Sequence, residues 1–275
     1  MTKYALLDYD GYVCKSLYAA ISSGDITEAP RILRELEQSA YDKMFDYFDD
    51  RDIKVIKVMS GHSWKKDKYL DYKAKRKKDP RVKEFRDWVL ENDETILKIE
   101  PLEADEVLVI MHDYLGNYTC DDCVIFSDDK DLHNVALLSC KINTDKLIDI
   151  SYNEDKLFCQ MLAGDKEDCV SGIPKVGMKT AEKLLQEKGQ HNLHTVIQIY
   201  KDKGISEEEC NKQLNLIDPL KREFVLKEDY MLYDIAGASL INEPEGVEFI
   251  IEDLINSQIE YIRQEVGKVY AESDK

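Results

Sequence analysis

The chain has 275 residues, of which 56 are Asp or Glu and 38 are Lys or Arg, so its net charge is −18. This length fits one large domain or a domain with a smaller annex. Hydrophobic residues make up 43% of the chain, which excludes wholesale disorder, and the acidic total argues against a general nucleic-acid coat. The longest apolar run, Val107–Met111, is far too short to cross a membrane.

The N-terminus and the cysteines predict a cytoplasmic protein. Asp8 and Asp10 interrupt the short apolar run Tyr4–Leu7, which is not typical of a signal peptide. Seven cysteines cannot all pair within one chain, and their scatter indicates reduced thiols.

Short apolar runs in the first half of the chain predict strands, and helical patterns fall between most of them. The predicted strands are Tyr4–Asp8, Ile53–Met59, Thr95–Ile99, Cys123–Ser127 and Lys141–Thr144. Amphipathic patterns from Pro30 to about Asp49 and over Leu102–Leu115 predict helices. Strands that alternate with helices imply an α/β fold whose central sheet is mostly parallel and flanked by helices.

Beyond residue 152 the strand signals fade. Residues 154–233 predict a series of short helices, and residues 251–271 predict one more amphipathic helix. We therefore expect an α/β core over residues 1–152 and a helical region over residues 153–275.

One segment, from Trp64 to Arg86, reverses the acidic trend. It has eleven basic residues and four acidic ones, a net charge of +7, so the rest of the chain carries −25. Aromatic residues are interleaved with these cations, as at Trp64, Tyr69 and Tyr72. Aromatic rings can stack on bases while lysines follow phosphates, so the pattern favours nucleic acid over a merely solvated helix face.

Acidic residues recur where the predicted strands end. Asp8 and Asp10 close the first strand, and residues i and i+2 of an extended chain point the same way. Ligands of open α/β sheets gather outside the carboxyl ends of the strands. The further acidic clusters are Glu103, Asp105 and Glu106 at the start of a helix, Asp129 and Asp131 after the fourth strand, and Asp165 and Asp168 in the helical region.

Such clusters predict divalent cations, because carboxylates gathered at one edge of a sheet repel one another. Oxygen ligands suit Mg²⁺ or Mn²⁺, and two such ions can clamp the attacking and leaving oxygens of a phosphodiester. The sequence has no Gly-x4-Gly-Lys-Ser/Thr loop and no evident Ser–His–Asp arrangement. The Cys-x-x-Cys pair at Cys120 and Cys123 leaves a zinc site open as a minor alternative.

From Tyr4 to Leu185, these motifs resemble the 5′-nuclease superfamily: flap endonucleases, phage 5′→3′ exonucleases and the 5′-nuclease domain of bacterial DNA polymerases. The longest match is Gly164-Asp-Lys-Glu-Asp168 followed by Gly172-Ile-Pro-Lys-Val-Gly-Met-Lys-Thr-Ala181, which is similar to the family's helix–three-turn–helix. Shorter matches are Tyr72-Lys-Ala-Lys-Arg76, Glu103-Ala-Asp-Glu106 and Ser127-Asp-Asp-Lys-Asp131.

The resemblance implies roles for the acidic and basic residues. Asp8, with Asp10 as its rival, would be a metal ligand, as would Glu103, Asp105, Asp129 and Asp131, with Glu106 joining through water. Asp165 and Asp168 would hold a second metal ion. Lys73 and Arg76 would act as catalytic cations at the base of a helical arch near the scissile phosphate.

The resemblance also implies how DNA is bound. A basic arch over about residues 62–90 would surround the 5′ strand, and a helix–three-turn–helix over about 157–188 would hold the duplex, with K⁺ on its carbonyls. Gly172 and Gly177 would permit a tight turn and a close backbone approach. The residues expected at DNA are Lys15, Lys65, Lys66, Tyr72, Lys77, Gly172, Lys175, Gly177, Lys179 and Thr180.

The implied activity is a metal-dependent 5′→3′ exonuclease or flap endonuclease acting on branched or 5′-ended DNA, or on an RNA–DNA hybrid during primer removal. The chain resembles stand-alone phage enzymes, so we expect a monomer in the host cytoplasm that meets replication proteins. The alternatives are a catalytically weak protein that binds DNA junctions and a PIN-type ribonuclease.

The sequence departs from the family pattern at four positions. Ser60 stands where the second strand usually ends in an Asp ligand, and Tyr9 stands where Gly is common. Cys169 and Lys175 replace the usual Asn and Gly of the helix–three-turn–helix motif. The Ser60 replacement weakens the expected first metal site.

Overall fold

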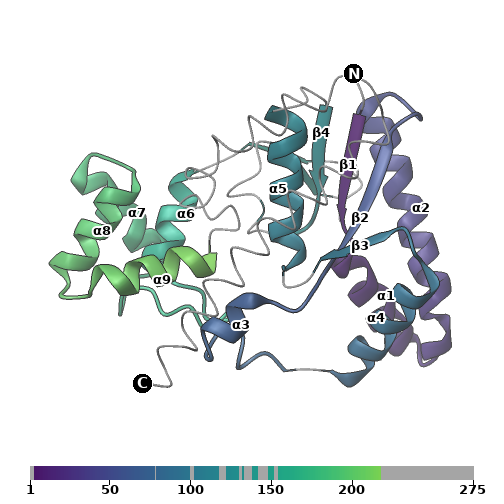
Figure 1. The fold of residues 1–275 in the computed structure, drawn as a ribbon, viewed down its shortest axis with the longest axis horizontal. Coiled ribbons are helices and arrows are strands. Elements are labelled where there is room, and N and C mark those ends of the chain that lie inside the picture. The colour runs from purple at the N-terminus through teal and green to yellow at the C-terminus, as the bar shows by residue number, and fades with distance from the viewer. Residues whose placement is uncertain are drawn as a thin grey trace. The chain divides into compact units, whose positions relative to one another are not determined.

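A computed structural model describes residues 3–77, 79–99, 102–117, 122–129, 132, 138–141, 148–151 and 154–217. The chain divides into two compact units (Figure 1). Unit 1 consists of Met1–His62 and Lys77–Ser151, and unit 2 consists of Ser63–Arg76 and Tyr152–Lys275. Residues 63–76, which belong to the segment expected as an arch on the core, are therefore grouped with the C-terminal unit.

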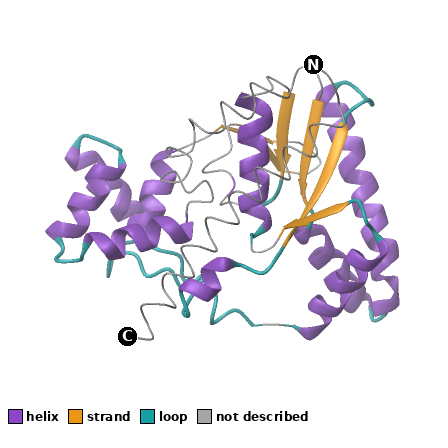
Figure 2. Cartoon of the chain, in the orientation of Figure 1, coloured by secondary structure: helices purple, strands orange, loops and turns teal. Residues whose placement is uncertain are grey.

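A six-stranded sheet forms the centre of the described part of unit 1 (Figure 2). Its strands are β1 (Lys3–Asp8), β2 (Lys54–Ser60), β3 (Ile96–Ile99), β4 (Asp122–Phe126), β5 (Leu138–Lys141) and β6 (Ile148–Ser151). The strand order is β3-β2-β1-β4-β5-β6, and only the β5–β6 pair is antiparallel. The expected mostly parallel α/β sheet is confirmed.

The apolar runs of the inner strands explain this sheet. Ala5, Leu6 and Leu7 of β1 are completely buried, as a parallel strand covered on both faces requires. The order of strands reverses between β1 and β4, because β2 and β3 continue on one side of β1 while β4, β5 and β6 continue on the other. Ligand sites of open α/β sheets lie at such a reversal, outside the carboxyl ends of the strands.

Helices cover both faces of the sheet (Figure 1). Helices α1 (Asp10–Ser23) and α2 (Ala29–Phe48) pack on one face, with a short 3₁₀ turn, η1 (Ile26–Glu28), between them, and α5 (Ala104–Asn117) lies on the other face. Helix α4 (Pro80–Asn92) packs against α1. The amphipathic stripe predicted for α2 is confirmed at Leu33, Ala40 and Met44, which are buried.

Unit 2 has a separate apolar core. Its helices are α3 (Trp64–Lys68), α6 (Glu154–Ala163), α7 (Met178–Lys188), α8 (Leu193–Asp202) and α9 (Glu207–Ile217). Tyr72, from the first part of this unit, is buried with Phe158, Leu185 and Tyr200 from the second part. The Tyr200 hydroxyl donates a hydrogen bond of 2.6 Å to the carbonyl of Met161, so the core has no unpaired phenol at this position.

Two local predictions differ from the structure. The fifth strand, predicted at Lys141–Thr144, ends at Lys141, and the antiparallel strand β6 was not predicted because it has only four residues. Asp10 is the first residue of helix α1 rather than part of the first strand. The helix expected at residues 251–271 lies outside the described residues. No helix among the described residues combines the length and the apolar character needed to cross a bilayer.

Candidate metal centre

Three carboxylates meet at the N-terminus of α5. One ligand oxygen from each of Glu103, Asp105 and Glu106 lies within 4.8 Å of the others. Glu103 and Glu106 are only 6% and 2% exposed. The residues could converge because Glu103 precedes the first helical turn, whereas on a regular helix Asp105 would point away from the other two. Buried carboxylates this close favour a bound cation.

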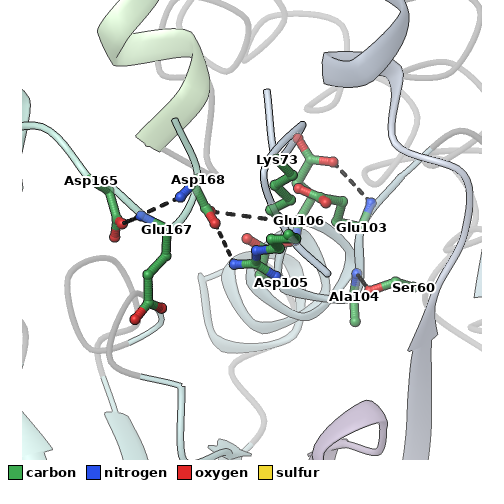
Figure 3. A network of polar contacts seen from close by, with 10 residues as sticks. Ser60, Lys73, Glu103, Ala104, Asp105, Glu106, Asp165, Glu167 and Asp168 are labelled. Atoms are coloured by element: carbon green, nitrogen blue, oxygen red, sulfur yellow. Dashed lines mark hydrogen bonds and ion pairs between the residues drawn. The ribbon is translucent and has the colours of Figure 1, made fainter. Parts of the chain in front are cut away.

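Hydrogen bonds hold this turn in place (Figure 3). The carboxylate of Glu106 accepts from the backbone N–H of Glu103 at 3.0 Å, and that of Asp105 accepts from the N–H of Glu106 at 2.9 Å. The hydroxyl of Ser60, at the end of β2, accepts from the N–H of Ala104 at 3.0 Å. Ser60 therefore caps α5 from outside the helix.

Asp8, at the end of β1, belongs to the same electrostatic environment. Its carboxylate accepts a hydrogen bond of 2.6 Å from the hydroxyl of Ser127, which follows β4. Burial raises the pKa of Asp8 to about 7 against the lowering effect of this hydrogen bond, and Asp10, Asp129 and Asp105 raise it further. The carboxyl of Asp8 is therefore buried among other carboxylates, where a cation would stabilise its charged form.

Ser127 is a site residue that the sequence motif contained but did not single out. It is 1% exposed, and its hydroxyl accepts from the backbone N–H of Asp129 at 2.9 Å while it donates to Asp8. One hydroxyl thus fixes the ends of β1 and β4 relative to each other. Asp129 itself is exposed, and its predicted partner Asp131 lies outside the described residues.

The structure separates the two rivals Asp8 and Asp10. Tyr9 adopts helical dihedral angles and leads into α1, so the extended-chain argument that put both carboxylates on one face is wrong. The carboxylate of Asp10 instead accepts from the N–H of Ser60 at 2.9 Å and forms an ion pair of 3.0 Å with Arg86. Arg86 also donates to the Ser60 carbonyl at 2.7 Å, a role that sequence reasoning missed.

Lys15, expected at DNA, lies beside this centre. Its ammonium group forms an ion pair with Asp128 and lies 5.5 Å from the centroid of the Tyr12 ring. Asp128, the residue between Ser127 and Asp129, is thus a second element of the site that no sequence motif assigned a role.

The second acidic pair lies in unit 2, with the predicted catalytic cations (Figure 3). Asp168 forms ion pairs with Arg76 and, at 3.9 Å, with Lys73. The N–H of Lys73 also donates to the carbonyl of Asp168 at 3.0 Å. Asp165 accepts from the N–H of Glu167 at 2.8 Å and from that of Asp168 at 3.4 Å. The structure therefore brings Lys73, Arg76 and Asp168 together, and the roles that the resemblance implied for them stay predictions.

The turns between α6 and α7 explain the glycine pattern only in part. Gly172 has a φ of 56°, and a Cβ atom there would lie 2.3 Å from the backbone N of Gly164, so this turn requires glycine. Gly177 has a φ of −110° with open space around it, so its own backbone does not require glycine, and the approach of either glycine to DNA stays a prediction. The helix–three-turn–helix and its potassium ion stay predictions.

Two departures from the family pattern fall at strained positions. Cys169 and Lys175 have φ values of 61° and 67°, in the left-handed region that Asn and Gly tolerate better than other residues. Lys73 also has a positive φ, 54°, so one of the predicted catalytic cations carries backbone strain.

Apart from Lys15, which is half-buried, the residues expected at DNA fall into two groups. The exposed ones are Lys66, Lys77, Lys175, Gly177, Lys179 and Thr180. Lys65 and Tyr72 are 1% and 4% exposed, and the Lys65 ammonium lies 5.6 Å from the Tyr72 ring centroid. Gly172 and the neighbouring aromatic Trp64 are buried too. A direct role at DNA does not fit Lys65, Tyr72 or Gly172, because their packing in unit 2 removes them from the surface.

No family model matches the sequence. DNA polymerase I of Caldicellulosiruptor bescii is 28% identical over 178 residues, which cover 57% of this chain and a fifth of that protein. The T5 protein co-crystallised with metal ions superposes with a TM-score of 0.59 at 15% identity over 94% of this chain and 99% of that one. The bacteriophage T5 flap endonuclease in a complex with DNA and metal ions gives a TM-score of 0.56 at 14% identity, with 95% and 99% covered. The resemblance to the 5′-nuclease superfamily is thereby confirmed, and the chain has the fold of the phage T5 enzyme.

Proposed function

We propose that the chain is a metal-dependent 5′ nuclease that hydrolyses phosphodiesters of branched or 5′-ended DNA, as a flap endonuclease or 5′→3′ exonuclease. The observation that carries the proposal is the cluster of Glu103, Asp105 and Glu106, beside Asp8 with its raised pKa. This cluster lies in a fold shared with a T5 protein that was crystallised with metal ions.

The donor set of unit 1 fits Mg²⁺ or Mn²⁺. Its ligands are carboxylate oxygens, and two of them, in Glu103 and Glu106, are nearly completely buried. A divalent cation there supplies an activated water and offsets the charge of a phosphodiester. Asp8 would be ionised with the cation bound, because the positive charge would lower its pKa again.

The cations of unit 2 suit a phosphate group. The guanidinium of Arg76 can hold two phosphate oxygens, and the ion pair with Asp168 already orients it. Lys73 adds a second positive charge beside it. Asp165 and Asp168 are proposed ligands of a second ion, and the ion pairs of Asp168 with Arg76 and Lys73 would have to rearrange for Asp168 to bind it.

The test is cleavage of a 5′-flap DNA labelled at both ends, with Mg²⁺ or Mn²⁺, by the wild type and by the Glu103→Gln/Asp105→Asn double variant. The proposal expects cleavage near the junction that the double variant loses by at least about 100-fold, since an essential cation loses two ligands. Glu91→Gln, which neutralises an exposed carboxylate of the same unit, should leave the rate unchanged. A flap whose 5′ segment is RNA tests primer removal in the same assay. A single-stranded RNA tests the PIN-type ribonuclease alternative.

The hydrogen bonds of Ser60 favour a second candidate, a protein that grips DNA junctions and cuts poorly. The hydroxyl of Ser60 is used to cap α5, and the adjacent Asp10 is paired with Arg86, so the end of β2 adds no carboxylate to the cluster. Tight binding of flap DNA without cleavage in either metal ion would support this candidate. Cleavage by the wild type would reject it.

A further inference from the structure

Tyr12, in the first turns of α1, is a buried residue with an unused polar group. Its side chain is 5% exposed, and its phenol oxygen is buried without a hydrogen-bond partner in the part of the chain that the structure describes. Buried polar groups in folded proteins are nearly always paired, because an unpaired one loses its water without compensation. Tyr41 and Tyr200, by contrast, donate to Glu37 at 2.7 Å and to Met161 at 2.6 Å.

The surroundings of Tyr12 are those of the candidate metal centre. Lys15 lies 5.5 Å from the ring centroid and forms an ion pair with Asp128. Burial raises the pKa of Tyr12, and the carboxylates of Asp128 and Asp8 raise it further. The phenol therefore keeps its proton and can act only as a neutral hydrogen-bond donor or acceptor. Asp8 and Asp128 flank the point at which the strand order reverses between β1 and β4.

The phenol donates to neither of these carboxylates, although both act on it electrostatically. Asp8 takes its hydrogen bond from Ser127 instead, and Asp128 takes the ammonium of Lys15. The strongest acceptors near Tyr12 thus have other donors, and its O–H, which has no partner among the described residues, is available to an oxygen atom of a bound group.

We propose that the Tyr12 hydroxyl donates a hydrogen bond to an oxygen ligand of a divalent cation bound beside Asp8. This oxygen belongs either to a water molecule or to a phosphate group of the nucleic acid. The proposal deepens the nuclease function above and rests on it. Tyr12 then acts as a positioning group for the oxygen that faces the carboxylates.

The test compares Tyr12→Phe with Tyr41→Phe, which removes a hydroxyl that has a partner in the same unit. Thermal unfolding without metal, the Mn²⁺ titration of the melting temperature, and kcat and KM on a 5′-flap DNA are measured for both variants. Tyr12→Phe should unfold at the wild-type temperature or above, because an unpaired buried hydroxyl is removed, while Tyr41→Phe should unfold at a lower temperature.

The proposal expects Tyr12→Phe to lower Mn²⁺ affinity or kcat/KM by about tenfold, the difference of one hydrogen bond to a charged group. A loss of Mn²⁺ affinity without DNA identifies the acceptor as water, and a loss seen only in KM identifies it as a phosphate. If Tyr12→Phe keeps wild-type Mn²⁺ affinity, kcat and KM, or is destabilised like Tyr41→Phe, the proposal is overturned. A wild type that binds Mn²⁺ but does not cut defeats the nuclease function alone, because Mn²⁺ affinity and the metal-dependent affinity for flap DNA, compared between the wild type and Tyr12→Phe, still decide the role of Tyr12. A wild type that neither binds Mn²⁺ nor cuts overturns both.

Discussion

Asp10 and Arg86 form an ion pair of 3.0 Å between helices α1 and α4, and both bind the backbone of Ser60. Ser60 uses its N–H, its carbonyl and its hydroxyl at once, and the hydroxyl caps the helix that begins with the acidic cluster. The position of these carboxylates therefore depends on an arginine from a distant part of the sequence.

Removal of Arg86 should destabilise unit 1. Arg86→Ala leaves the Asp10 carboxylate, only 24% exposed, without its cation and the Ser60 carbonyl without its donor. We expect a loss of about 2 kcal/mol in the free energy of unfolding, measured by urea titration. Lys83→Ala on the same helix removes an equally positive side chain from an exposed pair and should change the stability by less than about 0.5 kcal/mol. Equal effects of the two variants would contradict this account.

Glycine at a strained position in the turns between α6 and α7 should increase the stability of the protein. Lys175→Gly relieves a φ of 67°, and we expect a gain of about 0.5–1 kcal/mol, since the relief of left-handed strain exceeds the entropy cost of glycine. Lys166→Gly makes the same change at a nearby exposed residue that is not among those with a positive φ, and it should lower the stability instead. Differential scanning calorimetry of both variants gives the sign of each change in stability.

The glycines of this region should differ sharply in their tolerance of a methyl group. Gly172→Ala places a Cβ atom 2.3 Å from the Gly164 backbone, and we expect a loss of about 3 kcal/mol or more. Gly177→Ala adds its methyl group to open space at an ordinary φ and should be neutral or slightly stabilising. Thermal unfolding followed by circular dichroism measures both, and a tolerant Gly172 would mean that the turn can shift.

Protonation of His112 should destabilise the fold in mild acid. Burial lowers the pKa of this histidine, on α5, to about 4, against the raising effect of a hydrogen bond to the Cys123 backbone. The unfolded chain takes up a proton near pH 6.5, above the folded pKa, so the stability contributed at neutral pH is lost as the pH falls. Between pH 7.5 and pH 5 the loss is about 2 kcal/mol.

The variant His112→Gln separates the contribution of His112 to the pH dependence of stability from that of Asp8, which acts in the opposite direction. The raised pKa of Asp8, about 7, means that the folded state binds a proton more readily than the unfolded one, so Asp8 adds stability as the pH falls below 7. The difference in unfolding free energy between the wild type and His112→Gln should therefore shift by about 2 kcal/mol between the two pH values. A constant difference would show that His112 has the same pKa in the folded and unfolded states.

The parts of the fold that could be predicted were those governed by local pattern. The inner strands are continuous apolar runs, and α2 shows its buried stripe in the sequence, so both were placed to within a few residues. The convergence of Glu103, Asp105 and Glu106 was also predictable, because three acids at a helix start can face one point. Strand β6 and helix α1 were missed, since β6 has only four residues and α1 directly follows an acidic strand end.

The parts that could not be predicted depend on tertiary contacts. Arg86 belongs to a run of cations, and nothing in that run distinguishes the one whose partner is Asp10. Lys65 and Tyr72 resemble their exposed neighbours in sequence, yet they are buried in unit 2. The capping role of Ser60 required the start of α5, more than forty positions later, to lie at the end of β2.

The division of unit 2 into two segments bears on how the chain reaches its folded state. Asn215 donates a hydrogen bond of 3.4 Å to the hydroxyl of Tyr69 across 146 positions, and Tyr72 belongs to the same core. During synthesis, residues 63–76 therefore cannot complete their packing until α9 has been made. Residues 77–151, which lie between the two segments of unit 2 in the sequence, belong to unit 1. A fragment that began at residue 152 would lack Tyr72, which is buried in the core of unit 2. Unit 2 should therefore be expressed only with residues 63–76 present.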